Sequence, residues 1–174
     1  MQLVEVIDDF LSESQCKSLE SVMLKDNGTF PWFFVDNLNY DSKSRRIKKL
    51  GNYYLSNLLF EDGEEKGVHL PLFLPILNKL SLPLSKVHKI KANLYPRTQF
   101  RVHHAPHRDY PPGENKFTCL YYINDNNGFT VFEGKKKVKS KRNRMVRFDG
   151  SNIHNSTTCT DVNARYTVNF NCIR

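Results

Sequence analysis

The second half of this chain is a series of short apolar stretches separated by turn residues, and this pattern limits the fold more than any other feature. Stretches of this kind, rich in aromatic and apolar residues and bounded by Gly, Pro, Asn or Asp, are typical of strands. Asn126–Gly128 is a strong hairpin signal, and further turns are expected at Glu133–Gly134 and Asp149–Gly150. Seven or eight antiparallel strands at this spacing favour a jelly-roll barrel. The expected strands cover residues 88–95, 117–123, 129–132, 136–139, 144–148, 153–158 and 165–173.

The first half of the chain predicts helices that cover one sheet of this barrel. Ser12, with Gln15 three residues later, forms a capping box that marks the start of a helix. The expected elements are a strand over residues 3–10, a helix from Ser12 to about Asp26, and helices over residues 45–60 and 72–80. The last of these has Pro75 in its first turn. The fold class is therefore mainly β with flanking helices.

Length and composition fit one domain of 174 residues. Residues 1–86 would form the N-terminal strand and the supporting helices, and residues 87–174 the jelly-roll core. No apolar run approaches the roughly 20 residues of a membrane span, and the N-terminus lacks a stretch of signal-peptide type. We therefore expect a cytoplasmic protein. The four cysteines are scattered without a CxxC pair, which predicts reduced, buried thiols.

The last expected strand alternates apolar and polar side chains, so its two faces differ. If the apolar face packs on the helices, the polar face lines the barrel and Arg165 is buried. A buried guanidinium needs an anionic partner. We expect a carboxylate ligand that Arg165 holds bidentately, with Thr167 adding a hydroxyl hydrogen bond. The alternative is a structural ion pair between Arg165 and Asp161.

Three residues form a candidate metal site. His107 and Asp109 are two apart, which places both side chains on one face of a strand, and His154 follows forty-five residues after Asp109. Two histidines and one carboxylate on one face of the metal are typical of non-haem Fe(II) oxygenases, because they leave positions open. A mixed zinc site that includes His103 and His104 is the alternative. We interpret these two histidines as exposed loop residues.

Several segments of the second half resemble one enzyme family. They are HRD at 107–109, TCLYYIN at 118–124, NNGFTVFEG at 126–134, NRMVRFDGSNIHNS at 143–156 and ARYTVNFN at 164–171. Together they resemble the Fe(II)- and 2-oxoglutarate-dependent dioxygenases, and within them the prolyl 4-hydroxylase-like branch. The resemblance covers roughly residues 88–173, about half of the chain. The chain departs from the family at Asn127, where many members have glycine, and at Arg108, where a small or apolar residue is common.

The resemblance implies a role for each matching residue. By this likeness, His107, Asp109 and His154 are the iron ligands.

The same likeness implies four contacts to 2-oxoglutarate. Arg165 matches the residue that binds its distal carboxylate, and Thr167 sits where the family often has serine. Tyr122 matches a tyrosine that hydrogen-bonds the same carboxylate, with a plain core aromatic as the alternative. Tyr95 matches a tyrosine near the metal-binding end of the cosubstrate.

The activity implied by the resemblance couples oxidative decarboxylation of 2-oxoglutarate to succinate with hydroxylation of a substrate. The cofactors would be Fe(II), 2-oxoglutarate and dioxygen, with ascorbate in support. A prolyl residue in a protein or peptide is the first expectation for the substrate. A free amino acid or another small molecule comes second, and nucleobase demethylation third. The competing class is a non-enzymatic metal-binding jelly-roll protein.

A basic run between residues 135 and 147 holds eight of the 26 Lys and Arg residues, and the formal net charge is +8. A solvated hairpin with a charged edge is the first interpretation. The alternative is an electrostatic footprint for nucleic acid or an acidic partner, which the lack of interleaved aromatic residues disfavours.

Two loops could cover the site. Most rings of the aromatic segment 30–34 are expected in the core, although the loop 29–44 could offer Trp32 or Tyr40 to a substrate. The Pro- and Gly-rich stretch 104–115 flanks the HRD motif directly, so it is the better candidate for a lid.

Overall fold

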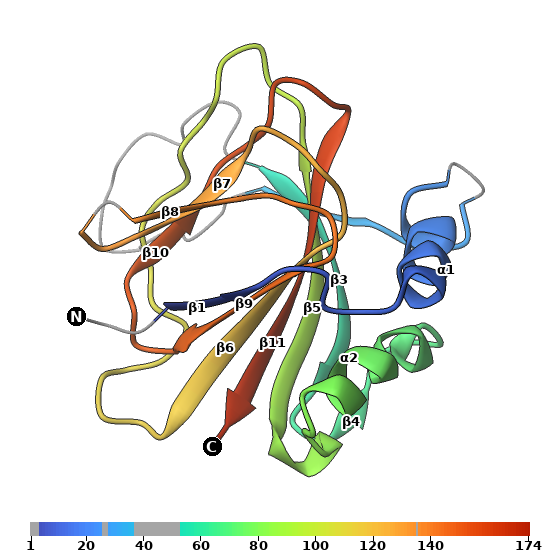
Figure 1. Cartoon of the computed structure of the whole chain (residues 1–174), viewed down its shortest axis with the longest axis vertical. Coiled ribbons are helices and arrows are strands. Elements are labelled where there is room, and N and C mark those ends of the chain that lie inside the picture. The colour runs from blue at the N-terminus through green and yellow to red at the C-terminus, as the bar shows by residue number, and fades with distance from the viewer. Residues whose placement is uncertain (1–3, 26–27, 37–52, 135) are drawn as a thin grey trace.

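The computed structural model describes residues 4–25, 28–36, 53–134 and 136–174, which form two antiparallel sheets with helices on one side (Figure 1). The large sheet has the order β1 (Val4–Ile7), β9 (Arg144–Asp149), β6 (Lys116–Tyr122), β11 (Ala164–Ile173), β5 (Val87–Pro96), β3 (Tyr54–Glu61) and β2 (Phe33–Val35), with β4 (Glu64–Glu65) paired to β3. The small sheet has the order β10 (His154–Ser156), β7 (Phe129–Phe132) and β8 (Lys137–Lys139). The helices are α1 (Glu13–Met23), α2 (Leu74–Lys79), and 3₁₀ turns at Leu70–Phe73 and Leu84–Lys86.

The large sheet lies between the two helices and the small sheet (Figure 1). Its helix-facing side is a large apolar cluster to which α1 contributes Cys16, Leu19 and Met23. A second, smaller cluster includes Leu120 from the large sheet and Phe132 from the small one. This arrangement confirms the expected jelly-roll architecture with helices on one sheet, and it leaves the site between the two sheets.

Helix α1 begins as expected. Ser12 accepts from the backbone N–H of Gln15, and the Gln15 side chain accepts from the backbone N–H of Ser12. This capping box satisfies two donors at the helix start. The helix expected over 72–80 is instead the 3₁₀ turn Leu70–Phe73 followed by α2, with Pro75 in the first turn of α2, where proline is tolerated.

The helix expected over residues 45–60 is wrong where it can be compared. Residues 45–52 lie outside the described residues, and Tyr54–Glu61 is strand β3, paired to β5. The register shifts between Leu58 and Phe60, so that Leu59 and Phe60 are both buried. This irregularity breaks the alternation of buried and exposed side chains that marks a strand. The spacing of the apolar residues in the sequence therefore resembled that of a helix.

The hairpin expected at Asn126–Gly128 is also wrong. The flanking strands do not pair with each other: β6 pairs with β9 and β11, whereas β7 pairs with β8 and β10. The segment is therefore a crossover between the two sheets. In contrast, the turn at Gly134, with φ of +82°, joins the paired strands β7 and β8 as expected.

The two faces of β11 are arranged as the alternation predicts. Val168, Phe170 and Cys172 belong to the apolar cluster under the helices. Arg165 and Thr167 line the pocket between the sheets.

The aromatic segment before β3 divides into two parts. Phe30 is buried and Trp32 packs against the core. Phe33 and Phe34 are exposed, at 61% and 64%, so the expectation that most of these rings are core is only half right. Tyr40 and the rest of the segment beyond residue 36 lie outside the described residues.

The four cysteines are free and buried, as expected. Among the described residues, no helix has the length and apolar character that crossing a membrane requires.

Candidate metal and cosubstrate site

The candidate metal ligands come from two segments that the backbone holds together. His107 and Asp109 lie in the connection between β5 and β6, outside the regular strands, and His154 opens β10. His107 and His154 form an isolated antiparallel bridge, in which each backbone N–H donates to the carbonyl of the other at 2.9 Å. His107 and Asp109 were expected to share one face of a strand. Instead, His107 is a single bridge residue and Asp109 lies in the loop that follows it.

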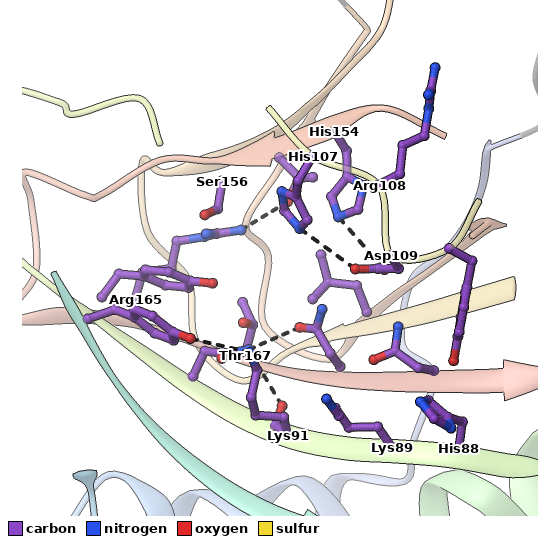
Figure 2. Close-up of a pocket in the computed structure, with 18 residues that line it drawn as sticks. His88, Lys89, Lys91, His107, Arg108, Asp109, His154, Ser156, Arg165 and Thr167 are labelled. Carbon is purple, nitrogen blue, oxygen red and sulfur yellow. Dashed lines mark hydrogen bonds and ion pairs between the residues drawn. The ribbon is translucent and has the colours of Figure 1, made fainter. Parts of the chain in front are cut away.

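The ligand atoms of these three side chains converge (Figure 2). All of them lie within 4.8 Å of one another. His107 Nε2 is 3.6 Å from Asp109 Oδ1, and His154 Nε2 is 3.9 Å from Asp109 Oδ2. Two ligands with bonds of about 2.1 Å to one ion can be at most about 4.2 Å apart, so both separations suit a common ion.

Neighbouring groups hold these ligands in place. His154 Nδ1 is 3.0 Å from the carbonyl oxygen of Asn152, which assigns the proton to Nδ1 and leaves Nε2 free for a metal. The Thr118 hydroxyl donates to Asp109 Oδ2 at 2.5 Å and accepts from Asn171 Nδ2 at 3.1 Å. Such outer hydrogen bonds fix the orientation of metal ligands.

Burial lowers the pKa of His107 to about 4, with the charge of His154 acting in the same direction and that of Asp109 opposing it. His107 is therefore neutral at pH 7, which is the form that binds metals. The donor set of two imidazoles and one carboxylate fits Fe(II).

Arg165 is 1% exposed, and its guanidinium has only neutral hydrogen-bond acceptors among the described residues. Nε donates to the Ser140 hydroxyl, Nη1 to the Thr157 carbonyl and Nη2 to the Thr130 hydroxyl. A guanidinium has five N–H groups, so one remains on each terminal nitrogen. The alternative pairing with Asp161 does not occur, since Asp161 accepts from the backbone of Asn127.

Other polar atoms near Arg165 also lack partners. The Thr167 hydroxyl is buried, and Thr167 lines the pocket. This hydroxyl has no hydrogen-bond partner among the described residues. This unsatisfied group and the two spare N–H groups of Arg165 together fit a carboxylate. The predicted pair Arg165 and Thr167 is thus brought together by the fold.

The two predicted tyrosines are placed differently from each other. Tyr122 is fully buried, and its hydroxyl donates to Thr130, the same oxygen that accepts from Arg165. It therefore lies behind the residues that line the pocket. Tyr95 lines the pocket, with its ring 5.2 Å from that of His104.

The interpretation of His104 as an exposed loop residue is wrong. His104 is 2% exposed, and its Nδ1 lies 2.7 Å from the Ser156 hydroxyl. Burial lowers its pKa to about 4. The side chain packs against Tyr95 instead of joining the metal ligands. His103 is exposed, as expected.

Sequence reasoning missed three groups around Arg165 and Tyr95: Thr130, Ser140 and His104. One signal was available for Thr130. It is a polar residue within the apolar strand β7, and the burial pattern places it on the inward face. Ser140 and His104 lie in loops, where the sequence shows no periodicity.

The site lies in a pocket of about 260 Å³ between the sheets. The metal triad forms one wall, and residues of β5 and β11 form the other (Figure 2). The lining residues are Tyr54, His88, Lys89, Lys91, Asn93, Tyr95, His107, Arg108, Asp109, Tyr110, Leu120, Thr130, His154, Ser156, Arg165, Thr167, Asn169 and Asn171. Arg108 lies between the two ligands in sequence, and its exposed side chain points away from the triad (Figure 2).

The basic run is mostly engaged within the protein. On β8, Lys137 and Lys139 are exposed on either side of buried Val138, and Lys135 lies outside the described residues. The ion pairs of the run are Lys141 with Asp8, Arg144 with Asp8, and Arg142 with Glu13 and Glu20. These ion pairs tie the run to the N-terminal segment.

No protein-family model matches the sequence, and a search of curated proteins finds no match. Solved structures do match. A prolyl hydroxylase from Trichoplax adhaerens, in complex with a hypoxia inducible factor oxygen degradation domain peptide fragment, has a TM-score of 0.68 at 16% identity, covering 98% of this chain and 83% of that one.

Two further structures resemble the chain. The viral collagen prolyl hydroxylase from Paramecium Bursaria Chlorella virus-1, in its 2OG complex, has a TM-score of 0.59 at 18% identity, covering 98% of this chain and 96% of that one. The alpha ketoglutarate dependent epimerase SnoN from nogalamycin biosynthesis has a TM-score of 0.69 at 10% identity, covering 99% and 76%. This chain therefore has the jelly-roll fold of the 2-oxoglutarate-dependent oxygenases.

Proposed function

We propose that this chain is an Fe(II)- and 2-oxoglutarate-dependent dioxygenase that hydroxylates its substrate. One observation carries the proposal: a pocket that contains the triad His107, Asp109 and His154 also contains a buried guanidinium with no carboxylate partner among the described residues. A metal site with a purely structural role does not require a buried, unpaired guanidinium beside it. The shared fold supports the same assignment.

Each residue has a separate task in this proposal. His107, Asp109 and His154 hold the iron, and Arg165 and Thr167 hold the distal carboxylate of 2-oxoglutarate. The bound iron and cosubstrate supply oxidative chemistry with dioxygen, which yields succinate, carbon dioxide and a hydroxylated product. Tyr95 orients the cosubstrate, while Tyr122 positions Thr130 and through it Arg165. The position of the pocket between the two sheets limits access of water to the bound groups.

For the substrate we propose a prolyl residue in a protein or peptide. The peptide complex of the Trichoplax enzyme and the likeness to the viral collagen prolyl hydroxylase support this choice. A small-molecule substrate is the second candidate, and the likeness to SnoN, an enzyme of nogalamycin biosynthesis, favours it.

Succinate release tests the proposal. Protein reconstituted anaerobically with Fe(II), 2-oxoglutarate and ascorbate should release succinate slowly on exposure to oxygen, even without substrate. His107→Ala should lose iron, whereas Arg165→Met should keep iron and bind 2-oxoglutarate at least tenfold more weakly, because a charge-assisted pair is lost. No turnover above a metal-free control, with zinc bound tightly, would contradict the enzyme assignment in favour of a non-enzymatic metal-binding protein.

A further inference from the structure

Lys91 differs from the other basic residues on its strand. Lys89 and His88 also line the pocket, but Lys89 Nζ is 2.6 Å from Glu61 Oε1 and His88 Nδ1 is 2.9 Å from Asp62 Oδ1. The Lys91 ammonium contacts only neutral groups of the described residues: the Tyr54 hydroxyl at 3.3 Å and the face of the same ring, 5.4 Å from its centre. Lys91 thus brings an uncompensated positive charge into the pocket.

Lys91 also lies on the wall that faces the triad. Figure 2 shows Lys91 on β5 across the pocket from His107 and Asp109. It pairs in register with Asn169 of β11. A group bound at Lys91 therefore occupies the same space as a substrate that faces the metal.

The charges in the pocket do not balance when the proposed cofactors are bound. Fe(II) is a dication, 2-oxoglutarate is a dianion, and the charges of Asp109 and Arg165 cancel. Asp109 is the one acidic residue among the lining residues that the structure describes. The positive charges of Arg108 and Lys91 remain. Arg108 is exposed to water, whereas Lys91 is half-buried, where an unpaired cation is unfavourable.

The surroundings of Lys91 also suit a polar ligand. Asn93, two residues further on the same face, is 2% exposed, and its Oδ1 is buried without a hydrogen-bond partner in the described part of the chain. Its Nδ2 donates to Asn169 Oδ1 at 3.1 Å. The wall beside Lys91 therefore offers an unsatisfied acceptor next to an uncompensated cation, which matches a carboxylate with a neighbouring N–H group.

We propose that the substrate carries a carboxylate that pairs with Lys91, so that this residue selects anionic substrates and sets which carbon faces the metal. The inference rests on the proposed function. The carboxylate can belong to a free amino acid or to an acidic residue of a peptide.

A binding experiment with small acids and their amides tests the anion site. The whole chain is loaded with Zn(II) and saturating 2-oxoglutarate, its lysines are labelled by carbon-13 reductive methylation, and the Lys91 signal is identified by its loss in Lys91→Arg. The probes are matched pairs: acetate and acetamide, L-proline and L-prolinamide, and a capped Glu-Pro-Glu peptide and its Gln-Pro-Gln counterpart. The second pair represents a free amino acid and the third an acidic peptide.

The acids should shift the Lys91 signal and the amides should not, while the Lys89 signal stays in place because Glu61 already pairs with it. L-Proline and the Glu-Pro-Glu peptide are then compared by the shift of the Lys91 signal that each causes at the same concentration. The larger shift shows whether the carboxylate belongs to a free amino acid or to a peptide. Amides that act as strongly as acids, or acetate that fails to move the signal, would overturn the proposal. So would a Lys91 signal that responds to 2-oxoglutarate and thereafter to no acid, because Lys91 would then bind the cosubstrate.

Turnover supplies the second measurement. Lys91→Gln should reduce acid-stimulated succinate release by roughly tenfold to a hundredfold, the usual effect of losing one charge-assisted contact. Lys91→Arg should retain part of the stimulation, and Lys89→Gln, which removes the same charge from the same strand, should retain all of it. Equal losses in Lys91→Gln and Lys89→Gln would refute a specific contact. A wild-type protein that releases no succinate would instead contradict the proposed function. The binding experiment does not depend on turnover, so it would still test the anion site at Lys91.

Discussion

Thr118 offers a sharp test of how the metal ligands are held. Its side chain is fully buried, and its hydroxyl donates to Asp109 Oδ2 while accepting from Asn171 Nδ2. Thr118→Val keeps the shape of the side chain and removes both hydrogen bonds. Asp109 then loses a donor that orients it toward the two histidines.

The magnitude follows from these contacts. A hydrogen bond to a charged group contributes about 1.5–3 kcal/mol, and loss of an outer-sphere partner typically weakens metal binding by tenfold to a hundredfold. We therefore expect Thr118→Val to lose about 1.4–2.7 kcal/mol of metal-binding free energy. Thr118→Ser, which keeps the hydroxyl, should bind nearly as the wild type does.

Competition with a chelator under anaerobic conditions measures this affinity for Fe(II) and Zn(II), and urea unfolding of the metal-free variants shows that the fold is kept. A folded Thr118→Val protein that binds both metals within about twofold of the wild type would refute the reasoning, since an effect of tenfold or more is expected.

Two further changes test the surroundings of Arg165 and Tyr95. A Cβ at Gly128 would lie 2.8 Å from Arg165 Cδ and 2.8 Å from Asn126 Oδ1, so Gly128→Ala should cost about 1–3 kcal/mol of unfolding free energy and weaken 2-oxoglutarate binding at unchanged metal content. Gly67→Ala, where nothing lies within 4 Å, is the control, and equal losses in urea unfolding would contradict the close approach. Burial holds the pKa of His104 at about 4, below its ordinary 6.5. The unfolded state therefore takes up this proton first, and about 3 kcal/mol of unfolding free energy is lost as the pH falls from 6.5 to 4. His104→Asn should flatten this part of the stability curve, and a curve parallel to that of the wild type would argue against a neutral buried imidazole.

The sequence was most informative where neighbouring residues form a regular pattern, such as the alternation of a strand or the capping box of a helix. The alternation in β11 predicted which side chains pack under the helices and which face the pocket, including Arg165 and Thr167. The capping box at Ser12 predicted the start of α1. In both cases the conformation of each residue depends on its neighbours in the sequence. The local pattern was therefore sufficient to predict the structure.

The predictions were wrong where contacts between residues far apart in the sequence determine the structure. Strand β3 is held by pairing with β5, and its irregular register hides the alternation. Gly128 looked like a hairpin glycine, but its small size is needed because Arg165 passes beside it. His104 is buried through Tyr95 and Ser156. None of these contacts has a signature in the local sequence, and each could be found only once the sheets were assembled.

If 2-oxoglutarate binds as proposed, the buried guanidinium of Arg165 also links the folding of this protein to the supply of that cosubstrate. A desolvated charge with neutral partners lowers the stability of the empty fold, and a carboxylate that fills the site restores it. Ligand at a hundredfold excess over its dissociation constant adds about 2.7 kcal/mol, a sizeable part of the total for a domain. Thermal unfolding of the wild type should therefore shift upward with 2-oxoglutarate, and Arg165→Met should abolish the shift without lowering the melting temperature of the empty protein. The amount of folded protein would then follow the concentration of a metabolite, so that this metabolite sets how much of the protein persists as well as how fast it works.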